Sequence, residues 1–247
     1  MKILIANWKA NPTTLEEAQE LFRSEIIEAD KYGNIQAIIC PPFVYLEELA
    51  KINSARLGAQ DAFWEKSGPF TGEVSTEMLK NFSVSHVLVG HSDRRYKIGE
   101  TDEVINKKIK AVLEADIVPV LLVGEKSRGD NRRQILEKQL SLDLEGLNSG
   151  QISKILIAYE PVWAISANPG AEPDTPENTL EAIKIIQEFL GSRFQVPGFR
   201  FLYGGSVNEK NVADFLSRPE ISGAVIGGAS LREDEFANIL RIVSEIE

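Results

Sequence analysis

Three side chains suited to proton transfer each follow closely on a short apolar run. They are Glu160 after Ile155–Tyr159, His91 after Val87–Val89, and Lys9 after Ile3–Ala6. An acid, an imidazole and an ammonium group in one pocket suit the removal of a proton beside a carbonyl group. The acid would take the C–H proton, while the other two would hold the oxyanion as it develops. Each residue alone also fits a structural or solvated role, and only a shared location would favour catalysis.

The segment around Glu160 has the features of a strand that ends at a site. Ile155–Tyr159 has the length and β-branched content of a buried strand. Pro161 ends it, because proline has no N–H to donate to a sheet. A carboxylate at that position is poorly solvated unless another group uses it. The polar run Ser166–Pro176 predicts a long loop that could close over Glu160.

Two glycine pairs predict a phosphate site. Gly204-Gly205-Ser206 and Gly227-Gly228 each follow an apolar run and precede residues that can begin a helix. Glycine lets the backbone approach a ligand closely, and free N–H groups at the start of a helix attract anions. Either pair alone is equally typical of a tight turn. Two pairs in neighbouring loops favour an anion site.

Other kinds of chemistry find less support in the sequence. Cys40 is the only cysteine, so we expect no intrachain disulfide and no cysteine metal cluster, and we expect Cys40 to pack as a small hydrophobic residue. Glycoside hydrolysis uses two facing carboxylates. It stays open because Glu125, like Glu160, follows an apolar run. His86 begins its run instead of ending it, so we expect it to be structural.

The elements that must position these groups repeat along the whole chain. Short apolar runs alternate with segments of helical periodicity, and the runs are nearly unbroken, as in parallel strands buried on both faces. The eight runs are Ile3–Ala6, Ala37–Cys40, Arg56–Ala59, Val87–Val89, Ile117–Val123, Ile155–Tyr159, Phe199–Tyr203 and Ala224–Ile226. The helical segments are Leu15–Ile26 with Thr13 or Thr14 as its cap, Val44–Ile52, Thr76–Asn81, Thr101–Ala115, Arg132–Leu147, Pro176–Leu190, Glu209–Leu216 and Asp234–Ile246.

Strand and helix that alternate eight times predict an α/β fold closed as a (β/α)8 barrel. A doubly wound open sheet is the alternative, but its first strand is usually followed by Gly-x-Gly-x-x-Gly, which Ala6–Lys9 does not show. No linker-like segment divides the chain, so we expect residues 1–247 to form a single domain. Active sites of such barrels lie at the carboxyl ends of the strands. The candidate catalytic groups and both glycine pairs fall there.

Composition narrows the class of partner and the compartment. The formal charge is −10, which argues against a nucleic-acid or anionic-membrane surface, and 43% hydrophobic residues suffice for a large core. No apolar run reaches the ~18 residues of a membrane span. The first residues, Met1–Lys9, lack the apolar stretch of a signal peptide. We expect a soluble cytoplasmic protein.

The motifs at the strand ends resemble those of the triosephosphate isomerase family over essentially the full chain. The matching stretches are Ala6–Lys9, Gly58–Gln60, Gly68–Glu73, Val89–Arg95, Val123–Glu125, Ala158–Ala164, Tyr203–Val207 and Ile226–Leu231. The resemblance implies reversible interconversion of dihydroxyacetone phosphate and D-glyceraldehyde 3-phosphate through an enediol(ate), without cofactor or metal, in glycolysis and gluconeogenesis. A phosphosugar-binding barrel without the chemistry and a barrel enzyme for another phosphosugar are the alternatives.

Carried over to matching positions, the resemblance implies a role for each candidate residue. Glu160 would be the base, His91 a neutral electrophile and Lys9 a stabiliser of negative charge. The substrate-binding residues would be Asn7, Lys9, Ser166 through its backbone N–H, Ser206, Gly227 and Gly228. The resemblance also implies a homodimer formed through Ala62–Glu73.

Several residues depart from the family pattern. Asp93 replaces the usual glutamate, Leu122 replaces the usual cysteine, and Ser166 replaces a glycine. The loop Ser166–Pro176 is also longer than usual. These departures affect the precision of the site and the motion of the loop more than the type of reaction.

Overall fold

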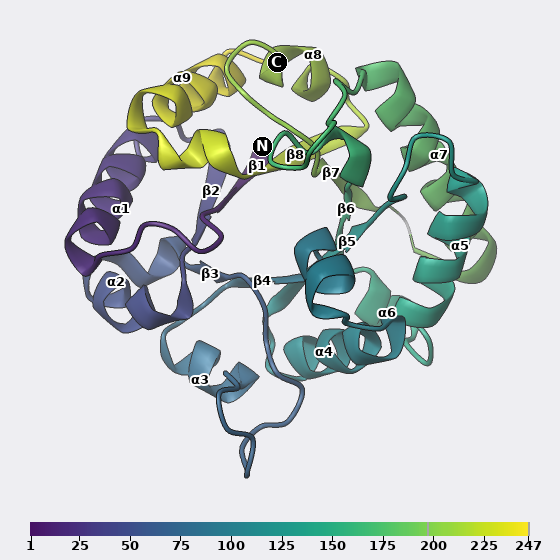
Figure 1. Ribbon diagram of the computed structural model, residues 1–247, viewed down its shortest axis with the longest axis horizontal. Coiled ribbons are helices and arrows are strands. Elements are labelled where there is room, and N and C mark those ends of the chain that lie inside the picture. Colours follow the sequence, from purple (N-terminus) through teal and green to yellow (C-terminus); the bar gives the residue numbers. More distant parts are fainter. Residues whose placement is uncertain (197, 247) are drawn as a thin grey trace.

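The computed structural model describes residues 1–196 and 198–246 and shows eight parallel strands surrounded by helices (Figure 1). The strands are β1 (Lys2–Asn7), β2 (Ile35–Cys40), β3 (Gly58–Ala59), β4 (His86–Val89), β5 (Val118–Val123), β6 (Leu156–Tyr159), β7 (Arg200–Tyr203) and β8 (Ile221–Ile226). Their order in the sheet is β2-β1-β8-β7-β6-β5-β4-β3. An isolated parallel bridge between Ile39 and Leu57 joins the two ends of the sheet. The near-closed barrel confirms the predicted (β/α)8 fold.

The helices form a ring outside the strands (Figure 1). They are α1 (Leu15–Ala29), α2 (Leu46–Asn53), α3 (Thr76–Asn81), α4 (Asp102–Glu114), α5 (Arg132–Asp143), α6 (Ser149–Ile152), α7 (Pro176–Arg193), α8 (Val212–Leu216) and α9 (Glu233–Ser244). Several begin at a side chain that accepts a backbone N–H, such as Thr14 for α1 and Thr175 for α7. Pro176 occupies the first turn of α7, where a missing N–H costs nothing.

Several predicted elements are shorter than the sequence pattern indicated, and two of them have a clear local cause. The expected strand Arg56–Ala59 is reduced to Gly58–Ala59, because Asn53 caps a 3-10 turn over Ser54–Arg56 that competes with extended backbone. The expected helix Arg132–Leu147 ends at Asp143. Gly146 follows with a φ of 77°, a left-handed conformation that stops a helix.

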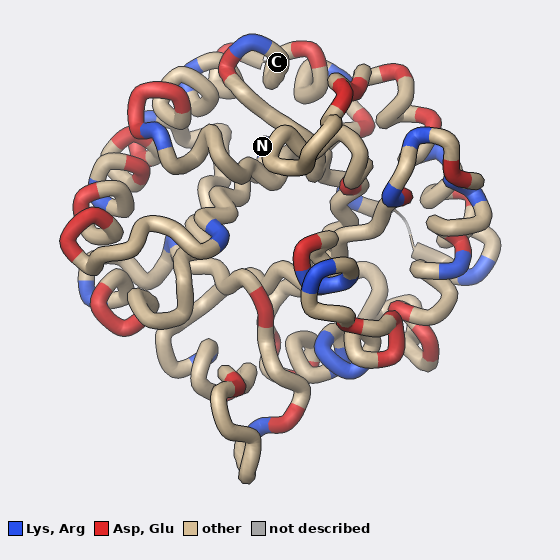
Figure 2. The backbone as a smooth tube through the Cα atoms, viewed as in Figure 1, with Lys and Arg blue, Asp and Glu red and all other residues tan. Residues whose placement is uncertain are grey.

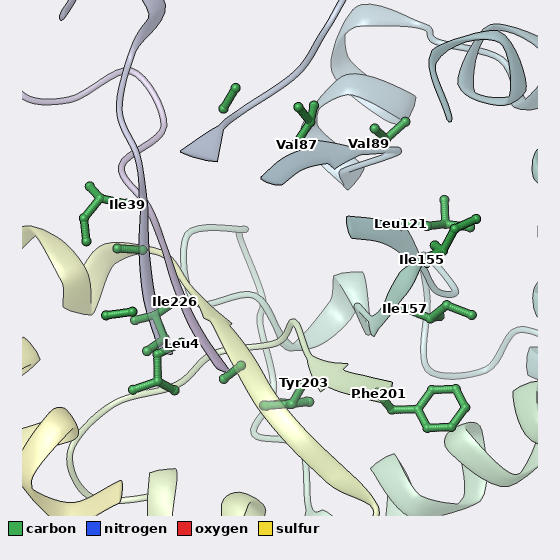
Figure 3. Packing of buried hydrophobic residues seen from close by; sticks show 14 of the residues in the cluster. Leu4, Ile39, Val87, Val89, Leu121, Ile155, Ile157, Phe201, Tyr203 and Ile226 are labelled. Carbon is green, nitrogen blue, oxygen red and sulfur yellow. The ribbon is translucent and has the colours of Figure 1, made fainter. Parts of the chain in front are cut away.

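The core has two layers because alternate strand residues point to opposite faces. Ile3, Ile5 and Leu122 lie in the cluster inside the barrel, together with Cys40, which is buried as expected. The outer layer lies between strands and helices. Figure 3 shows members of it standing on successive strands, among them Leu4, Val87, Leu121, Ile157 and Ile226.

Charged residues of both signs are interspersed around the ring of helices (Figure 2). Within the described ranges, none of the helices is long and apolar enough to cross a membrane.

Close packing of β8 against β1 requires glycine at position 223, and this can be tested. A Cβ at this position would lie 1.8 Å from the backbone oxygen of Ile3, which cannot move without breaking the sheet. We expect Gly223→Ala to lower the free energy of unfolding by about 3 kcal/mol or more. Gly191→Ala in α7 meets nothing within 4 Å and should leave stability unchanged or slightly higher. Urea unfolding of both variants measures this, and equal stabilities would contradict the packing argument.

Candidate active site

A cavity of about 680 Å³ opens at the carboxyl ends of the strands. Its lining includes all eight residues that the sequence singled out, which are Asn7, Lys9, His91, Glu160, Ser166, Ser206, Gly227 and Gly228. They come from the ends of β1, β4, β6, β7 and β8 and from the loop after β6. Parallel strands bring these distant segments to one rim, so a carboxylate, an imidazole and an ammonium group share a pocket with two glycine-rich turns.

The Glu160 carboxylate is only 2% exposed and is held by its neighbours from β4. Its Oε2 accepts the backbone N–H of Ser92 at 2.9 Å, and its Oε1 accepts the Ser92 hydroxyl at 2.9 Å. Nε2 of His91 lies 3.2 Å from Oε1. Sequence reasoning did not single out Ser92, although it directly follows His91. Ser92 fixes the carboxylate beside the imidazole.

The hydrogen bonds of His91 define its tautomer. The backbone N–H of Asp93 donates to Nδ1 of His91 at 3.0 Å. Because a backbone N–H can only donate, Nδ1 must be an acceptor, and the ring proton lies on Nε2. The neutral imidazole therefore directs its N–H toward the Glu160 carboxylate and the cavity. A group so placed can donate a hydrogen bond to a substrate oxygen.

Lys9 is held in an unusual backbone conformation, with a φ of 54° that side-chain-bearing residues rarely adopt. Its N–H donates to Oδ1 of Asn7 at 3.1 Å, and its backbone oxygen accepts Nε2 of Gln60 at 2.7 Å. Its ammonium donates to Oδ2 of Asp93 at 3.0 Å. The backbone strain is balanced by these contacts, which aim the ammonium group at the cavity.

Asp93 reaches Lys9 although its side chain is one methylene shorter than the usual glutamate. Lys97, one helical turn further on, pairs with the other oxygen of Asp93 at 2.7 Å. Burial would raise the pKa of Asp93, but hydrogen bonds from Lys97 and Lys9 outweigh it and lower the pKa to about 2. Sequence reasoning missed Lys97; its spacing of four residues from Asp93 on a helical turn is the signal that could have found it.

Glu125 is not a second carboxylate of the cavity. It is 1% exposed, and its Oε1 accepts Tyr159 Oη at 2.8 Å, Trp163 Nε1 at 3.0 Å and Arg132 Nε at 3.1 Å. Since these donors hold Glu125 away from the cavity lining, Glu125 and Glu160 do not form the pair of facing carboxylates that glycoside hydrolysis requires. His86, at the amino end of β4, lies on the opposite rim as expected. Burial lowers the pKa of His86 to about 4.

The first glycine pair is required by the close packing of the chain around it. A Cβ on Gly205 would lie 2.2 Å from the Tyr203 hydroxyl, and one on Gly204 would lie 3.2 Å from the backbone oxygen of Tyr159. Gly227 and Gly228 begin a 3-10 turn that ends at Leu231. Together with Ser206 they form the side of the cavity where exposed backbone N–H groups can meet an anion.

The loop Ser166–Pro176, which we call the lid, borders two cavities. Ser166 and Ala167 line the main cavity. Asn168, Pro169, Gly170 and Glu172 line a neighbouring one of about 480 Å³. The lid therefore lies between the site and solvent, where its movement can open or cover the site. Among residues 1–196 and 198–246, no group of three or more His, Cys, Asp or Glu side chains is arranged to hold a metal ion.

The low pKa of Asp93 gives its ion pairs a defined pH window. An unfolded aspartate titrates near 3.9, so the pairs stabilise the fold above about pH 4 and lose this contribution as the pH falls toward 2. We expect Asp93→Asn to reduce the free energy of unfolding by about 1 kcal/mol at pH 6, and we expect that difference to vanish near pH 2. Urea unfolding of both proteins from pH 2 to 6 tests this. A difference that does not change with pH would show that Asp93 is not held ionised by the two lysines.

Comparison with known proteins agrees with this site. The family model for triosephosphate isomerase matches residues 2–243. A triosephosphate isomerase of Dictyoglomus thermophilum is 43% identical over 97% of this chain and 98% of its own length. One from Dehalococcoides mccartyi is also 43% identical, over 99% of this chain and 97% of its own length. The crystal structure of triosephosphate isomerase from Bartonella henselae superposes with a TM-score of 0.83 at 32% identity and covers 98% of both chains. The chain belongs to the triosephosphate isomerase family.

Proposed function

We propose that Glu160, His91 and Lys9 carry out the reversible interconversion of dihydroxyacetone phosphate and D-glyceraldehyde 3-phosphate. The family supplies the reaction, and with it a place in glycolysis and gluconeogenesis. One observation supports the residue roles: a buried carboxylate, a neutral imidazole N–H and an ammonium group line a single cavity beside two glycine-rich turns.

The proposed reaction needs no external redox partner. The Glu160 carboxylate removes a proton from the carbon next to the carbonyl, and the electron pair moves onto the carbonyl oxygen. Nε2–H of His91 and the Lys9 ammonium stabilise the resulting enediolate. His91 then gives its Nε2 proton to the former carbonyl oxygen and takes the hydroxyl proton from the neighbouring oxygen. A carbonyl forms at that second oxygen, and Glu160 returns its proton to the carbon that first bore the carbonyl. This division of roles is the established pattern of the family. In the described conformation Ser92 holds Glu160, so we propose that bound substrate replaces those hydrogen bonds.

The phosphate is proposed to lie against Ser206, Gly227, Gly228 and the backbone N–H of Ser166, with Asn7 also contacting the substrate. Closure of the lid would then exclude water, which strengthens the electrostatic contacts and protects the enediolate from losing phosphate. Ser166 retains the N–H of the glycine that it replaces. Its side chain narrows only the range of backbone angles.

Turnover of dihydroxyacetone phosphate in a coupled assay tests the function, and Glu160→Asp tests the base. Shortening the side chain moves the carboxylate by roughly an ångström, so we expect kcat to fall about 100-fold with a much smaller change in KM. Comparable kcat values would remove Glu160 from the role of base. A parent protein that binds a substrate analogue without turnover would instead favour the phosphosugar-binding alternative.

We also propose a homodimer formed through Ala62–Glu73. This segment lies between β3 and α3 and projects beyond the ring of helices (Figure 1). Its aromatic rings pack on one another, with ring centroids 4.1 Å apart for Phe63 and Trp64 and 4.8 Å apart for Phe63 and Phe70. Phe70 is nevertheless 40% exposed, as expected of a ring that awaits a partner. Residues 1–247 are proposed to act as a single domain, of which residues 197 and 247 lie outside the described part.

Sedimentation velocity tests the dimer. We expect the parent to sediment at twice the chain mass and Phe70→Asp to shift it toward monomer, because the charge would be buried in the interface. Leu142→Asp on α5 is the matched control, since Leu142 is 39% exposed but lies outside Ala62–Glu73. A monomeric parent, or a Phe70→Asp variant that stays dimeric, would contradict a dimer formed through Ala62–Glu73.

A further inference from the structure

The two ends of the lid are joined by one continuous chain of side-chain hydrogen bonds. At the amino end, Nε1 of Trp163 donates to Oε1 of Glu125, and the same oxygen accepts Nε of Arg132. At the carboxyl end, Asn178 accepts Nη2 of Arg132 with its side-chain oxygen and donates its side-chain nitrogen to Oδ1 of Asp174. The chain therefore runs from Trp163, just before the lid, to Asp174, near the carboxyl end of the lid. The residues that link them, Glu125, Arg132 and Asn178, lie outside the lid.

We propose that Arg132 and Asn178 are positioning residues that couple the two ends of the lid, so that both change conformation together. This inference rests on the proposed function, in which the lid covers the triose phosphate. It concerns residues outside the catalytic cavity: Arg132, Asn178 and Asp174 do not line that cavity.

At the amino end of the lid, the buried carboxylate of Glu125 depends strongly on its hydrogen-bond donors. Oε1 of Glu125 accepts from Tyr159, Trp163 and Arg132, whereas Oε2 is buried without a partner. A carboxylate in such a place is destabilised when any donor leaves, because water does not replace the donor. If Trp163 moves away with the lid, Glu125 loses one donor, and the buried negative charge then depends more strongly on its hydrogen bond from Arg132. The guanidinium of Arg132 must then follow the carboxylate.

A movement at Glu125 can be passed on to Asn178 because the guanidinium of Arg132 is planar and rigid and contacts both residues. One edge binds Glu125 through Nε, and the terminal nitrogens bind the side-chain and backbone oxygens of Asn178. The side chain is 17% exposed, so water screens these contacts only in part. A shift of the guanidinium toward Glu125 therefore withdraws donors from Asn178.

The side-chain amide of Asn178 links Arg132 to Asp174 in only one orientation. Its oxygen faces Arg132 and its nitrogen faces Asp174, so a flip of the amide would break both contacts. Asp174 is also held by Thr179 Oγ1 at 2.8 Å, and Thr179 is fully buried in α7. Burial raises the pKa of Asp174, in keeping with a carboxyl group that depends on these donors. Release of Asn178 would thus loosen the point where the lid joins α7.

A second tie to the lid is weaker. Arg128 pairs with Glu172 at 2.6 Å, but the two side chains are 61% and 58% exposed. Solvent-exposed ion pairs contribute little because water and salt screen them. The chain through Arg132 is less exposed than this ion pair, so water screens it less. It acts beside a direct backbone contact, in which the N–H of Glu172 donates to the oxygen of Trp163 at 3.1 Å.

A double-mutant cycle in kcat/KM tests the coupling. Trp163→Phe removes the indole N–H at one end, and Asn178→Ala removes the amide at the other. Two residues that act through one network show non-additive losses, so the double variant should retain about fivefold more activity than the product of the single losses predicts. In an Arg132→Lys background, which lacks the guanidinium that links the two ends, the two fold-losses in kcat/KM should simply multiply. Activity is measured in both directions, so that a diffusion-limited step in one does not hide the losses.

The matched control uses another contact of the same arginine. Nη1 of Arg132 lies 3.7 Å from Glu181, whose side chain is 77% exposed. Glu181→Gln combined with Trp163→Phe should show losses that simply multiply. Thermal melting of every variant identifies any that lose the fold, and Asp174→Asn then replaces Asn178→Ala in the cycle.

Hydrogen exchange supplies a readout that does not require turnover. When it is the only substitution, Asn178→Ala should speed amide exchange at both ends of the lid. When it is combined with Arg132→Lys, it should speed exchange only near Asp174. The proposal is wrong if exchange at Trp163 is unaffected by Asn178→Ala, or if the kinetic coupling persists unchanged after Arg132→Lys. An inactive parent whose lid exchange shows the coupling would overturn the proposed function alone.

Discussion

Burial of the Glu160 carboxylate at the mouth of the barrel is the constraint on which the rest of the site depends. A charge that is 2% exposed must be compensated by donors, and here Ser92 provides two of them. Those donors come from the end of β4, so the carboxylate can be buried only if β4 and β6 end at the same rim. Both strands pair with β5 in register, which sets the distance between their ends. The barrel therefore brings the donors at the end of one strand to the buried charge at the end of another.

The same reasoning explains how the site tolerates its departures from the family pattern. Asp93 is shorter than glutamate, yet it still meets Lys9, and Lys97 pairs with its second oxygen. Leu122 lies in the apolar cluster inside the barrel, where a larger hydrophobic side chain replaces a smaller one without bringing in a polar group. These changes keep the charges balanced and the interior apolar. Lys9, His91 and Glu160 consequently remain together in the lining of one cavity.

The lid differs in kind from the barrel that carries it. The barrel is fixed by backbone ladders and by two buried apolar layers, whereas the lid is attached mainly at its ends. Glu125 and Asp174 are the carboxyl groups at those attachments, and each depends on donors from α5 or α7. Hydrogen bonds of this type can pass from one donor to another when the side chains move together, while packed strands cannot shift without opening the core. In the proposed function, motion is thereby confined to the lid.

The sequence by itself determined the architecture and the membership of the site. Apolar runs that alternate with helical periodicity dictate parallel strands and outer helices, and parallel strands place Lys9, His91 and Glu160 on one rim by topology alone. These are local patterns, each readable within a few residues. The same local reading misjudged the strand at Arg56–Ala59, because the side-chain cap from Asn53 competes with extended backbone.

Only the tertiary structure decided which partners hold the charged groups. Ser92 and Glu160 are 68 residues apart in sequence, and Arg132 and Asn178 are 46 apart. No periodicity records such pairs, because they depend on the closure of the barrel and on the rotamers that packing leaves open. The exclusion of Glu125 from the cavity follows from the same cause. Its position after a strand resembles that of Glu160, but the donors around it direct it to the base of the lid.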